Sequence, residues 1–294
     1  MRDDLLKRME QGMKGFSKGQ RQIAAYIIEH CDKAAYMTAS KLGAAVNVSE
    51  STVVRFAIEL GFDGYPEFQR AMQNIIRNHL KSFQRIEVTN QLIGGGDVLE
   101  KVLASDMEKI KHTLDAVDRT AFDAAVDQLI AAKNIYVFGV RSSASLANFL
   151  SYSLRMVFDN VRMIQSTSGS EVFEQMLGIG KNDVLIAISF PRYSNRVVTA
   201  VEYAHRARAD VIALTDSPSS PIAAYANQLL TAQSDMASFM DSLVAPLSII
   251  NALIVALSRK RQEDLTERLR HLEQIWEEYE VYDSKSTAEK EDSI

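Results

Sequence analysis

The strongest constraint on the fold of this chain lies in its rear half, where five short apolar runs alternate with segments of helical pattern. Because the runs are almost free of polar residues, both faces of each strand must be covered. Strands of this kind, joined by helices, form a parallel sheet between two helix layers. The sequence therefore predicts an α/β domain with a five-stranded parallel sheet. The runs occupy residues 134–139, 160–164, 183–189, 210–216 and 227–232.

Polar side chains follow the first three of these runs, where each predicted strand ends. Ligands of open parallel sheets bind at the carboxyl ends of the strands. Hydroxyls, arginines and the backbone amides of helix N-termini together suit a phosphate or a carboxylate. The sequence therefore predicts a site for a small anion. Its expected residues are Gly139, Arg141, Ser142, Ser143, Ser166, Thr167, Ser189, Arg192 and Ser194.

The alternative for these serines is purely structural. Ser142, Ser170 and Ser194 precede helical segments and could act only as N-caps. Two other ligand sites are disfavoured. Only Gly139 of a G-x-G-x-x-G pattern is present, and the glycine run 94–96 has neither a preceding strand nor a following Lys-Ser/Thr pair.

The front part of the chain has the pattern of a helix-turn-helix. A first short helix is capped by Thr38, a second is capped by Ser49 and stopped by Gly61, and Asn47 in the joint tolerates a left-handed backbone. The second helix would place its N-terminal residues in the major groove of DNA. The alternative is a helical hairpin with a solvated polar face. The expected DNA-binding residues are Lys41, Ser49, Glu50, Ser51, Thr52 and Arg55.

Charge and flexibility divide the chain into an N-terminal all-helical domain and the α/β domain. Residues 1–85 carry a net charge of +4 and the remainder −9, so only the front favours a polyanion. We expect a helix-turn-helix domain at 1–81, a linker at 82–97, a ligand-sensing domain at 98–282 and a disordered tail at 283–294.

Several classes of function are excluded by composition. No apolar run reaches the roughly 18 residues that span a bilayer. The single cysteine, Cys31, cannot form an internal disulfide, and the five histidines are scattered. We therefore expect a cytoplasmic protein with no membrane partner, no metal site and no cofactor.

With these motifs placed, the chain resembles the RpiR/MurR family of bacterial transcription regulators. The resemblance rests on "VSESTVVRFAIELGF" (48–62) and "GYPEFQ" (64–69) in front, and on serine-bearing loops after the first and third strands behind. It implies a sugar isomerase (SIS) domain with flavodoxin-like strand order that senses a phosphorylated sugar or related anion. It also implies a homodimer or homotetramer on a palindromic double-stranded DNA operator.

The resemblance maps the phosphate-loop serines of the family onto Ser142, Ser143, Ser189 and Ser194. The loop after the third strand departs from the family pattern, which runs serine, any residue, serine, glycine, any residue, threonine. Pro191 and Arg192 replace the middle serine and the glycine, and the first loop carries Arg141 where a small residue is common. Two arginines could hold a phosphate more tightly or select a carboxylate.

Two questions stay open from the sequence. A sugar-phosphate isomerase with structural front helices is the alternative to a regulator, and Glu171, Glu174 and His205 are its candidate bases. The groove-reading helix favours the regulator and no enzymatic activity. For the dimer surface, the helices at 97–117 and 240–257 are candidates, although burial in the core would explain their apolar residues equally well.

Overall fold

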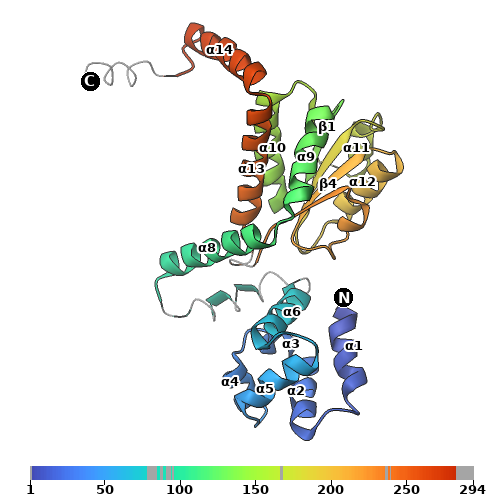
Figure 1. Cartoon of the computed structure of the whole chain (residues 1–294), viewed down its shortest axis with the longest axis vertical. Helices are drawn as coiled ribbons and strands as arrows, with labels where there is room; N and C mark the ends of the chain where they lie inside the picture. Colours follow the sequence, from blue (N-terminus) through green and yellow to red (C-terminus); the bar gives the residue numbers. More distant parts are fainter. Residues whose placement is uncertain are drawn as a thin grey trace, which may run out of the picture. The chain divides into compact units, whose positions relative to one another are not determined.

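The chain forms two compact units (Figure 1). The first joins Met1–Ser105 to Asp235–Ser242, and the second joins Asp106–Ser234 to Leu243–Ile294. Most of the predicted linker and all of the predicted tail lie outside the described residues, so those boundaries stay predictions. The computed structural model describes residues 2–77, 85–86, 89–90, 94, 96–165, 168–235, 238 and 240–282.

The front unit is helical between residues 2 and 77. Its second helix begins with a capping box, in which the Ser17 side chain accepts from the Gln20 amide and the Gln20 side chain accepts from the Ser17 amide. Edge-to-face contacts of Phe56 with Phe16 and Phe68 lie at the centre of its core. The helices are α1 (Arg2–Gly12), α2 (Lys18–Glu29), α3 (Cys31–Ala34), α4 (Ala39–Ala45), α5 (Glu50–Glu59) and α6 (Tyr65–Arg77).

Helices α4 and α5 form the predicted helix-turn-helix. Thr38 caps α4 by accepting from the Lys41 amide, and Ser49 caps α5 by accepting from the Thr52 amide. Asn47 in the turn has φ of 54°, in the left-handed region that its side chain tolerates. The caps and turn residue that the sequence indicated therefore set the geometry of this motif.

Helices α4 and α5 meet through buried residues such as Leu42 and Val53, whereas Ala45 and Ile58 are exposed. Gly43 permits the close approach of the two helices. A Cβ at Gly43 would lie 2.8 Å from the carbonyl oxygen of Val48, which is backbone and cannot move aside cheaply.

Helix α6 braces the segment that leads into α4. The hydroxyl of Tyr65 and the amide of Gln69 each donate to the carbonyl oxygen of Met37 at 2.7 Å, and the amide of Gln73 donates to Ala35 at 3.0 Å. Burial raises the pKa of Tyr65 to about 12. These three side chains recur every fourth residue, so one face of α6 fixes the start of the helix-turn-helix.

The rear unit contains the predicted parallel sheet. Its order is β2-β1-β3-β4-β5, which is the flavodoxin-like order. All pairs are parallel, and Gly139 of β1 pairs with Ile188 of β3, which in turn pairs with Leu214 of β4. The strands are β1 (Ile135–Gly139), β2 (Val161–Met163), β3 (Val184–Ile188), β4 (Asp210–Thr215) and β5 (Gln228–Thr231).

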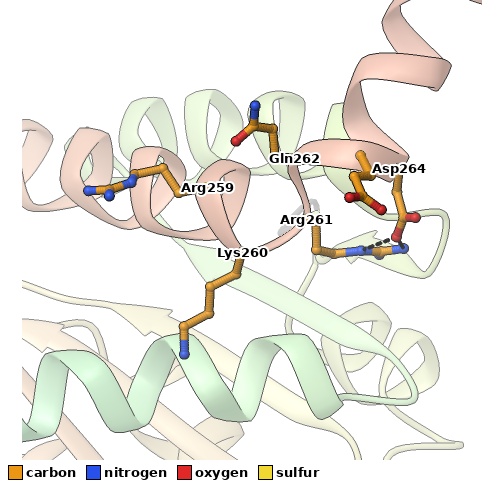
Figure 2. Close-up of a pocket in the computed structure, with 6 residues that line it drawn as sticks. Arg259, Lys260, Arg261, Gln262 and Asp264 are labelled. Carbon is orange, nitrogen blue, oxygen red and sulfur yellow. Dashed lines mark hydrogen bonds and ion pairs between the residues drawn. The ribbon is translucent and has the colours of Figure 1, made fainter.

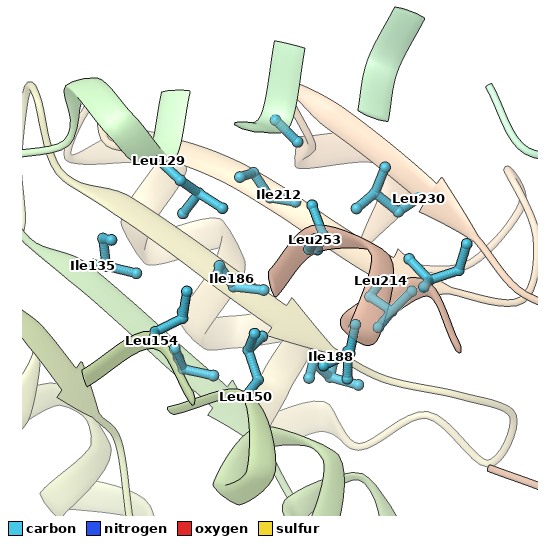
Figure 3. Packing of buried hydrophobic residues seen from close by; sticks show 14 of the residues in the cluster. Leu129, Ile135, Leu150, Leu154, Ile186, Ile188, Ile212, Leu214, Leu230 and Leu253 are labelled. Atoms are coloured by element: carbon cyan, nitrogen blue, oxygen red, sulfur yellow. The ribbon is translucent and has the colours of Figure 1, made fainter. Parts of the chain in front are cut away.

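Helices cover both faces of the sheet. On one face, alternate strand residues such as Val137, Ile186 and Ile212 pack against α9, α10 and α13 (Figure 3). On the other face, neighbours such as Phe138 and Leu185 pack against α11 and α12. The helices of this unit are α9 (Arg119–Ala131), α10 (Ser142–Val157), α11 (Gly169–Gln175), α12 (Asn195–Arg206), α13 (Val244–Lys260) and α14 (Gln262–Glu278), with a short 3-10 helix η1 (Ala223–Tyr225).

The two helices proposed for a dimer surface behave differently. Helix α13 buries Ile250, Leu253 and Leu257 in the core beneath the sheet, so burial explains its apolar character. Helix α8 (Val98–Ala116) leaves most of its apolar residues exposed. After α8 the chain is interrupted at Asp118, whose side chain caps α9 by accepting from two backbone amides.

Candidate functional site

The register of the sheet brings the loops after β1, β3 and β4 to one edge. Because Gly139 and Ile188 are paired, β1 and β3 end at the same level. The ladder continues one step further between β3 and β4, where the Ser189 amide donates to the Leu214 carbonyl at 3.1 Å. The expected anion-binding residues of the first and third loops therefore start from neighbouring points.

The loop after β1 is short and tightly packed. Arg141 is exposed with φ of 57° and ψ of −127°, a backbone conformation that favours glycine. Ser142 is the first residue of α10 and Ser143 is buried one residue further, so Ser142 is not the N-cap. A Cβ at Gly139 would lie 2.7 Å from the Ser143 carbonyl oxygen, so this glycine serves the close packing of α10 on β1.

The loop after β3 has a buried base and an exposed tip. Ser189 and Pro191 are buried, whereas Arg192 is exposed with φ of 64°. Ser194 occupies the N-cap of α12, yet its side chain makes no capping hydrogen bond. Arginine therefore stands in the left-handed conformation where the family pattern has glycine, and the Ser194 hydroxyl is not committed to the helix.

Sequence reasoning missed the contribution of β4 to this edge. The Tyr193 hydroxyl donates to the Asp216 carboxylate at 2.8 Å, and the Thr215 hydroxyl donates to the Ser189 carbonyl at 2.7 Å. Asp216 directly follows β4, so the strand-end rule applied to the first three strands would also have found it. These bonds tie the loop after β3 to the end of β4 and place a carboxylate beside the expected anion site.

The loop after β2 is only partly described. Ser166 and Thr167 lie outside the described residues, so their assignment stays a prediction. Ser168, not Ser170, is the N-cap of α11, and its hydroxyl accepts from the Glu171 amide at 3.4 Å. The alternative that these serines act only as helix caps is therefore not supported. Ser142 and Ser170 do not occupy the N-cap position, and Ser194 occupies it without making a capping hydrogen bond.

Of the three candidate bases of an isomerase, Glu171 is half-buried in the first turn of α11, which follows β2. His205 lies in the last turn of α12, at the opposite end of the helix from Ser194, and contacts the ring of Tyr225. Glu174 is exposed on α11. Among the described residues, no group of three His, Cys, Asp or Glu side chains could hold a metal ion.

The expected DNA-binding residues lie on the exposed side of the helix-turn-helix, with Thr52 half-buried. The hydroxyl of Ser49 lies 2.9 Å from that of Ser51 and 2.8 Å from that of Thr52, so these hydroxyls form one cluster at the N-terminus of α5. Arg55 follows one turn later, with its Nε donating to the Ser51 carbonyl. Lys41 and Glu50 are exposed as well.

A polar pocket of about 430 Å³ lies at the joint of α13 and α14 (Figure 2). Its lining includes Arg259, Lys260 and Arg261. Lys260 pairs with Asp127, and Arg261 pairs with Asp264 and donates to the Val157 carbonyl. Lys260 and Arg261 are therefore each paired with a carboxylate of the chain, which makes this joint of two helices a less favourable anion site. None of the helices that the structure describes is long and apolar enough to cross a membrane.

Comparison with known proteins addresses the identity of both units. The model of the rpiR-family helix-turn-helix domain matches residues 3–79, and that of the SIS domain matches residues 128–256. HexR of Escherichia coli, a helix-turn-helix transcriptional regulator, is 25% identical over 288 residues, covering 94% of this chain and 95% of HexR. HexR of Pseudomonas aeruginosa is 25% identical over 280 residues, covering 92% and 95%.

Solved structures share the fold. Vibrio vulnificus NanR, complexed with ManNAc-6P, aligns with a TM-score of 0.57 at 22% identity, covering 93% of this chain and 98% of NanR. The sugar isomerase domain of an RpiR transcription factor from Sphaerobacter thermophilus aligns with a TM-score of 0.57 at 25% identity, covering 59% and 97%. The curated relatives are regulators, which supports the prediction of a regulator without enzymatic activity. Together, the helix-turn-helix, the parallel sheet and the regulators that match over most of the chain identify this protein as a helix-turn-helix transcriptional regulator, with an N-terminal helix-turn-helix domain of the rpiR family and a C-terminal SIS domain.

Proposed function

We propose that this regulator acts in the cytoplasm as a homodimer or homotetramer on a palindromic DNA operator, and that a small anion at the carboxyl edge of its sheet controls that binding. The observation that carries the proposal is the alignment of two loops, each with an exposed arginine and a serine within two residues of it, at paired strand ends. A two-fold protein suits a two-fold operator because each half-site meets the same surface.

For DNA recognition, the residues proposed are Lys41, Ser49, Glu50, Ser51, Thr52 and Arg55. Arg55 could fork onto a guanine edge or hold a phosphate, and the hydroxyl cluster of Ser49, Ser51 and Thr52 could exchange its internal bonds for phosphate oxygens. The N-terminus of α5 adds backbone amides and a positive dipole end. Since Ser49 also caps α5, its replacement would weaken the helix as well as the DNA contact.

For the effector, a phosphorylated sugar is favoured over a plain carboxylate. The related NanR structure contains ManNAc-6P, which supports a sugar phosphate. Arg141 and Arg192 would grip the phosphate, and Ser142, Ser189 and Ser194 would bind its oxygens or the sugar. Asp216 at the same edge would repel a second charge, which favours a ligand with one anionic end and neutral hydroxyls elsewhere.

The control mechanism proposed is linkage between the two sites. If the effector binds one conformation of the dimer more tightly, and that conformation binds the operator differently, each ligand changes the affinity of the other by the same factor. A coupling of about 1–3 kcal/mol changes operator affinity by roughly 5–150-fold. Either sign of regulation satisfies this relation.

Two pairs of variants test the assignment. Arg55→Ala should reduce affinity for DNA selected from a random pool by the wild-type protein, whereas exposed Arg70→Ala on α6 should not. Arg192→Ala should reduce affinity for the phosphosugar or carboxylate that stabilises the wild type in a thermal-shift screen. Its control is Arg208→Ala, since Arg208 is also exposed with positive φ (65°) but precedes β4 at the other edge of the sheet. Unchanged DNA affinity in Arg55→Ala, or unchanged effector affinity in Arg192→Ala, would remove that residue from its site.

A further inference from the structure

Helix α8 is inverted relative to an ordinary surface helix. The face that packs against the protein carries Lys109 and Thr113, each only 5% exposed. Lys109 pairs with Asp106 at 3.2 Å, and the Thr113 hydroxyl accepts from the Gln233 amide at 2.8 Å. A surface helix normally buries its apolar stripe and exposes its polar residues. The apolar residues of α8 therefore need another partner.

Five of those apolar residues form one stripe, which we name the α8 stripe. At about 100° per residue they fall within roughly 80° of the helix circumference. Figure 1 shows α8 as one unbroken helix, so the stripe is continuous. Its members and their exposed fractions are Leu99 (68%), Leu103 (55%), Met107 (71%), Ile110 (39%) and Leu114 (57%).

The spacing of the stripe is symmetric about its centre. Leu99 and Leu114 lie nearly equal distances on either side of Met107, as do Leu103 and Ile110. An antiparallel copy of the same helix would therefore set Leu99 against Leu114, Leu103 against Ile110 and Met107 against itself. A two-fold interface requires this self-complementarity. We propose that the α8 stripe is the surface where two copies of this chain meet, antiparallel about an axis near Met107.

Charge at the margin of the stripe agrees with this pairing. Glu100 and Lys111 are both exposed and lie next to the stripe on its side remote from Lys109 and Thr113. They are about 16 Å apart along one helix, too far to pair within it. In the antiparallel pair, Glu100 of one copy lies about two residues, or roughly 3 Å along the axis, from the level of Lys111 of the other, which is within reach of these long side chains, once at each end. Two attractive pairs therefore fix the direction of the helices.

The apolar area is sufficient for a contact between copies. The five residues together leave roughly 500 Å² exposed, at the upper end of what a monomeric surface tolerates. Pairing two stripes would bury roughly 1,000 Å², about the minimum for a specific interface. The inference rests on the proposed dimeric regulator, for which it supplies the contact surface.

The first experiment is sedimentation equilibrium of the full-length protein. Leu114→Glu should raise the dimer dissociation constant about tenfold or more, because a charge would be buried in the interface. Val255→Glu is the matched control, since Val255 is 58% exposed on α13, outside the stripe. If Leu114→Glu dissociates no more than Val255→Glu, the stripe is covered by another segment or protein and the inference is wrong. A wild type that stays monomeric would instead contradict the proposed dimeric regulator.

A charge exchange at the surface keeps the test independent of folding. Glu100→Lys alone places two lysines opposite each other and should raise the dissociation constant several-fold. Adding Lys111→Glu restores opposite charges at both ends and should return the constant to within about twofold of wild type. Because these side chains cannot meet within one helix, rescue requires two copies. A double variant no tighter than Glu100→Lys would refute the antiparallel pairing.

Discussion

Replacing Gly139 by alanine tests the close packing beneath the expected anion site. Gly139 ends β1 and is among the residues predicted to line the ligand. An added Cβ would lie 2.7 Å from the carbonyl oxygen of Ser143 and 3.3 Å from the Cβ of Ala147. An ordinary contact needs at least about 3.4 Å, so the first turn of α10 must move by roughly 0.7 Å. Its carbonyl cannot swing aside, because helix geometry holds it.

The expected cost follows from overpacking. Adding a methyl to a close-packed position costs about 1–3 kcal/mol, and replacing glycine returns about 0.4–1 kcal/mol by restricting the unfolded chain. The net loss in unfolding free energy should be about 1–2 kcal/mol. Gly178→Ala is the matched control, since no atom lies within 4 Å of its added Cβ. The variants should differ by about 2 kcal/mol, or roughly 4–8 °C in Tm, measured by circular dichroism on the full chain.

The Gly139→Ala substitution should also lower the affinity for the effector, because the displaced turn carries Ser142 and Ser143. Once the screen supplies a ligand, titration calorimetry should give a lower affinity for Gly139→Ala and wild-type affinity for Gly178→Ala. If Gly139→Ala unfolds at the same temperature as Gly178→Ala, the contact between β1 and α10 is not tight. If it is destabilised but binds normally, Gly139 is structural and the turn lies outside the site.

Three further predictions address other positions. Arg141→Gly should raise the free energy of urea unfolding by about 1 kcal/mol, because glycine adopts the positive φ without strain, and it should also weaken effector binding. The control Arg208→Gly should stabilise the protein without changing effector binding. Ser194→Ala should lower effector affinity with little loss of stability, while Asp118→Ala, which removes two capping bonds, should cost about 1 kcal/mol and leave the effector unaffected. Because burial raises the pKa of Tyr65 to about 12, folding keeps its proton above pH 10, and the resulting stability falls as pH rises from 10 to 12. The Tyr65→Phe variant should lack this fall, so its stability relative to wild type should rise by about 1.4 kcal/mol between pH 9 and pH 11 in thermal unfolding; equal changes in both proteins would contradict the shift.

The sequence predicted the elements whose signals are local. Five apolar runs predicted five strands within one or two residues. The signal is strongest for β1, β3 and β4, which are buried almost throughout, and weaker for the outer strands β2 and β5, which are partly exposed. The caps Thr38 and Ser49 and the left-handed Asn47 were predicted because capping and turn chemistry depend on residues within four positions.

Features that depend on distant packing were not predicted. Gly43 and Gly139 have ordinary sequence surroundings, and only the fold shows a carbonyl within 3 Å of where a side chain would begin. The bond between Tyr193 and Asp216 joins residues 23 positions apart. Periodicity also shows that α8 and α13 are apolar but not which of them is covered, because coverage is a property of their neighbours.

The two loop arginines show why a departure from the family pattern points toward function. Arg141 and Arg192 both have positive φ, where a side chain costs roughly 1–2 kcal/mol that glycine avoids. Because the side chains of Arg141 and Arg192 are both exposed, this backbone strain is not explained by burial of either side chain in the core. Arg208 also has a positive φ (65°) at the other edge of the sheet, so positive φ alone does not mark a site. Arg141 and Arg192 differ from Arg208 because the paired strands β1 and β3 bring both of them to one edge of the sheet. Nearby lie Ser194, whose hydroxyl makes no capping bond, and the buried Ser143 and Ser189. Strain of this kind persists where a charge must occupy a fixed place, and an anion bound between the two loops would supply the energy that offsets it.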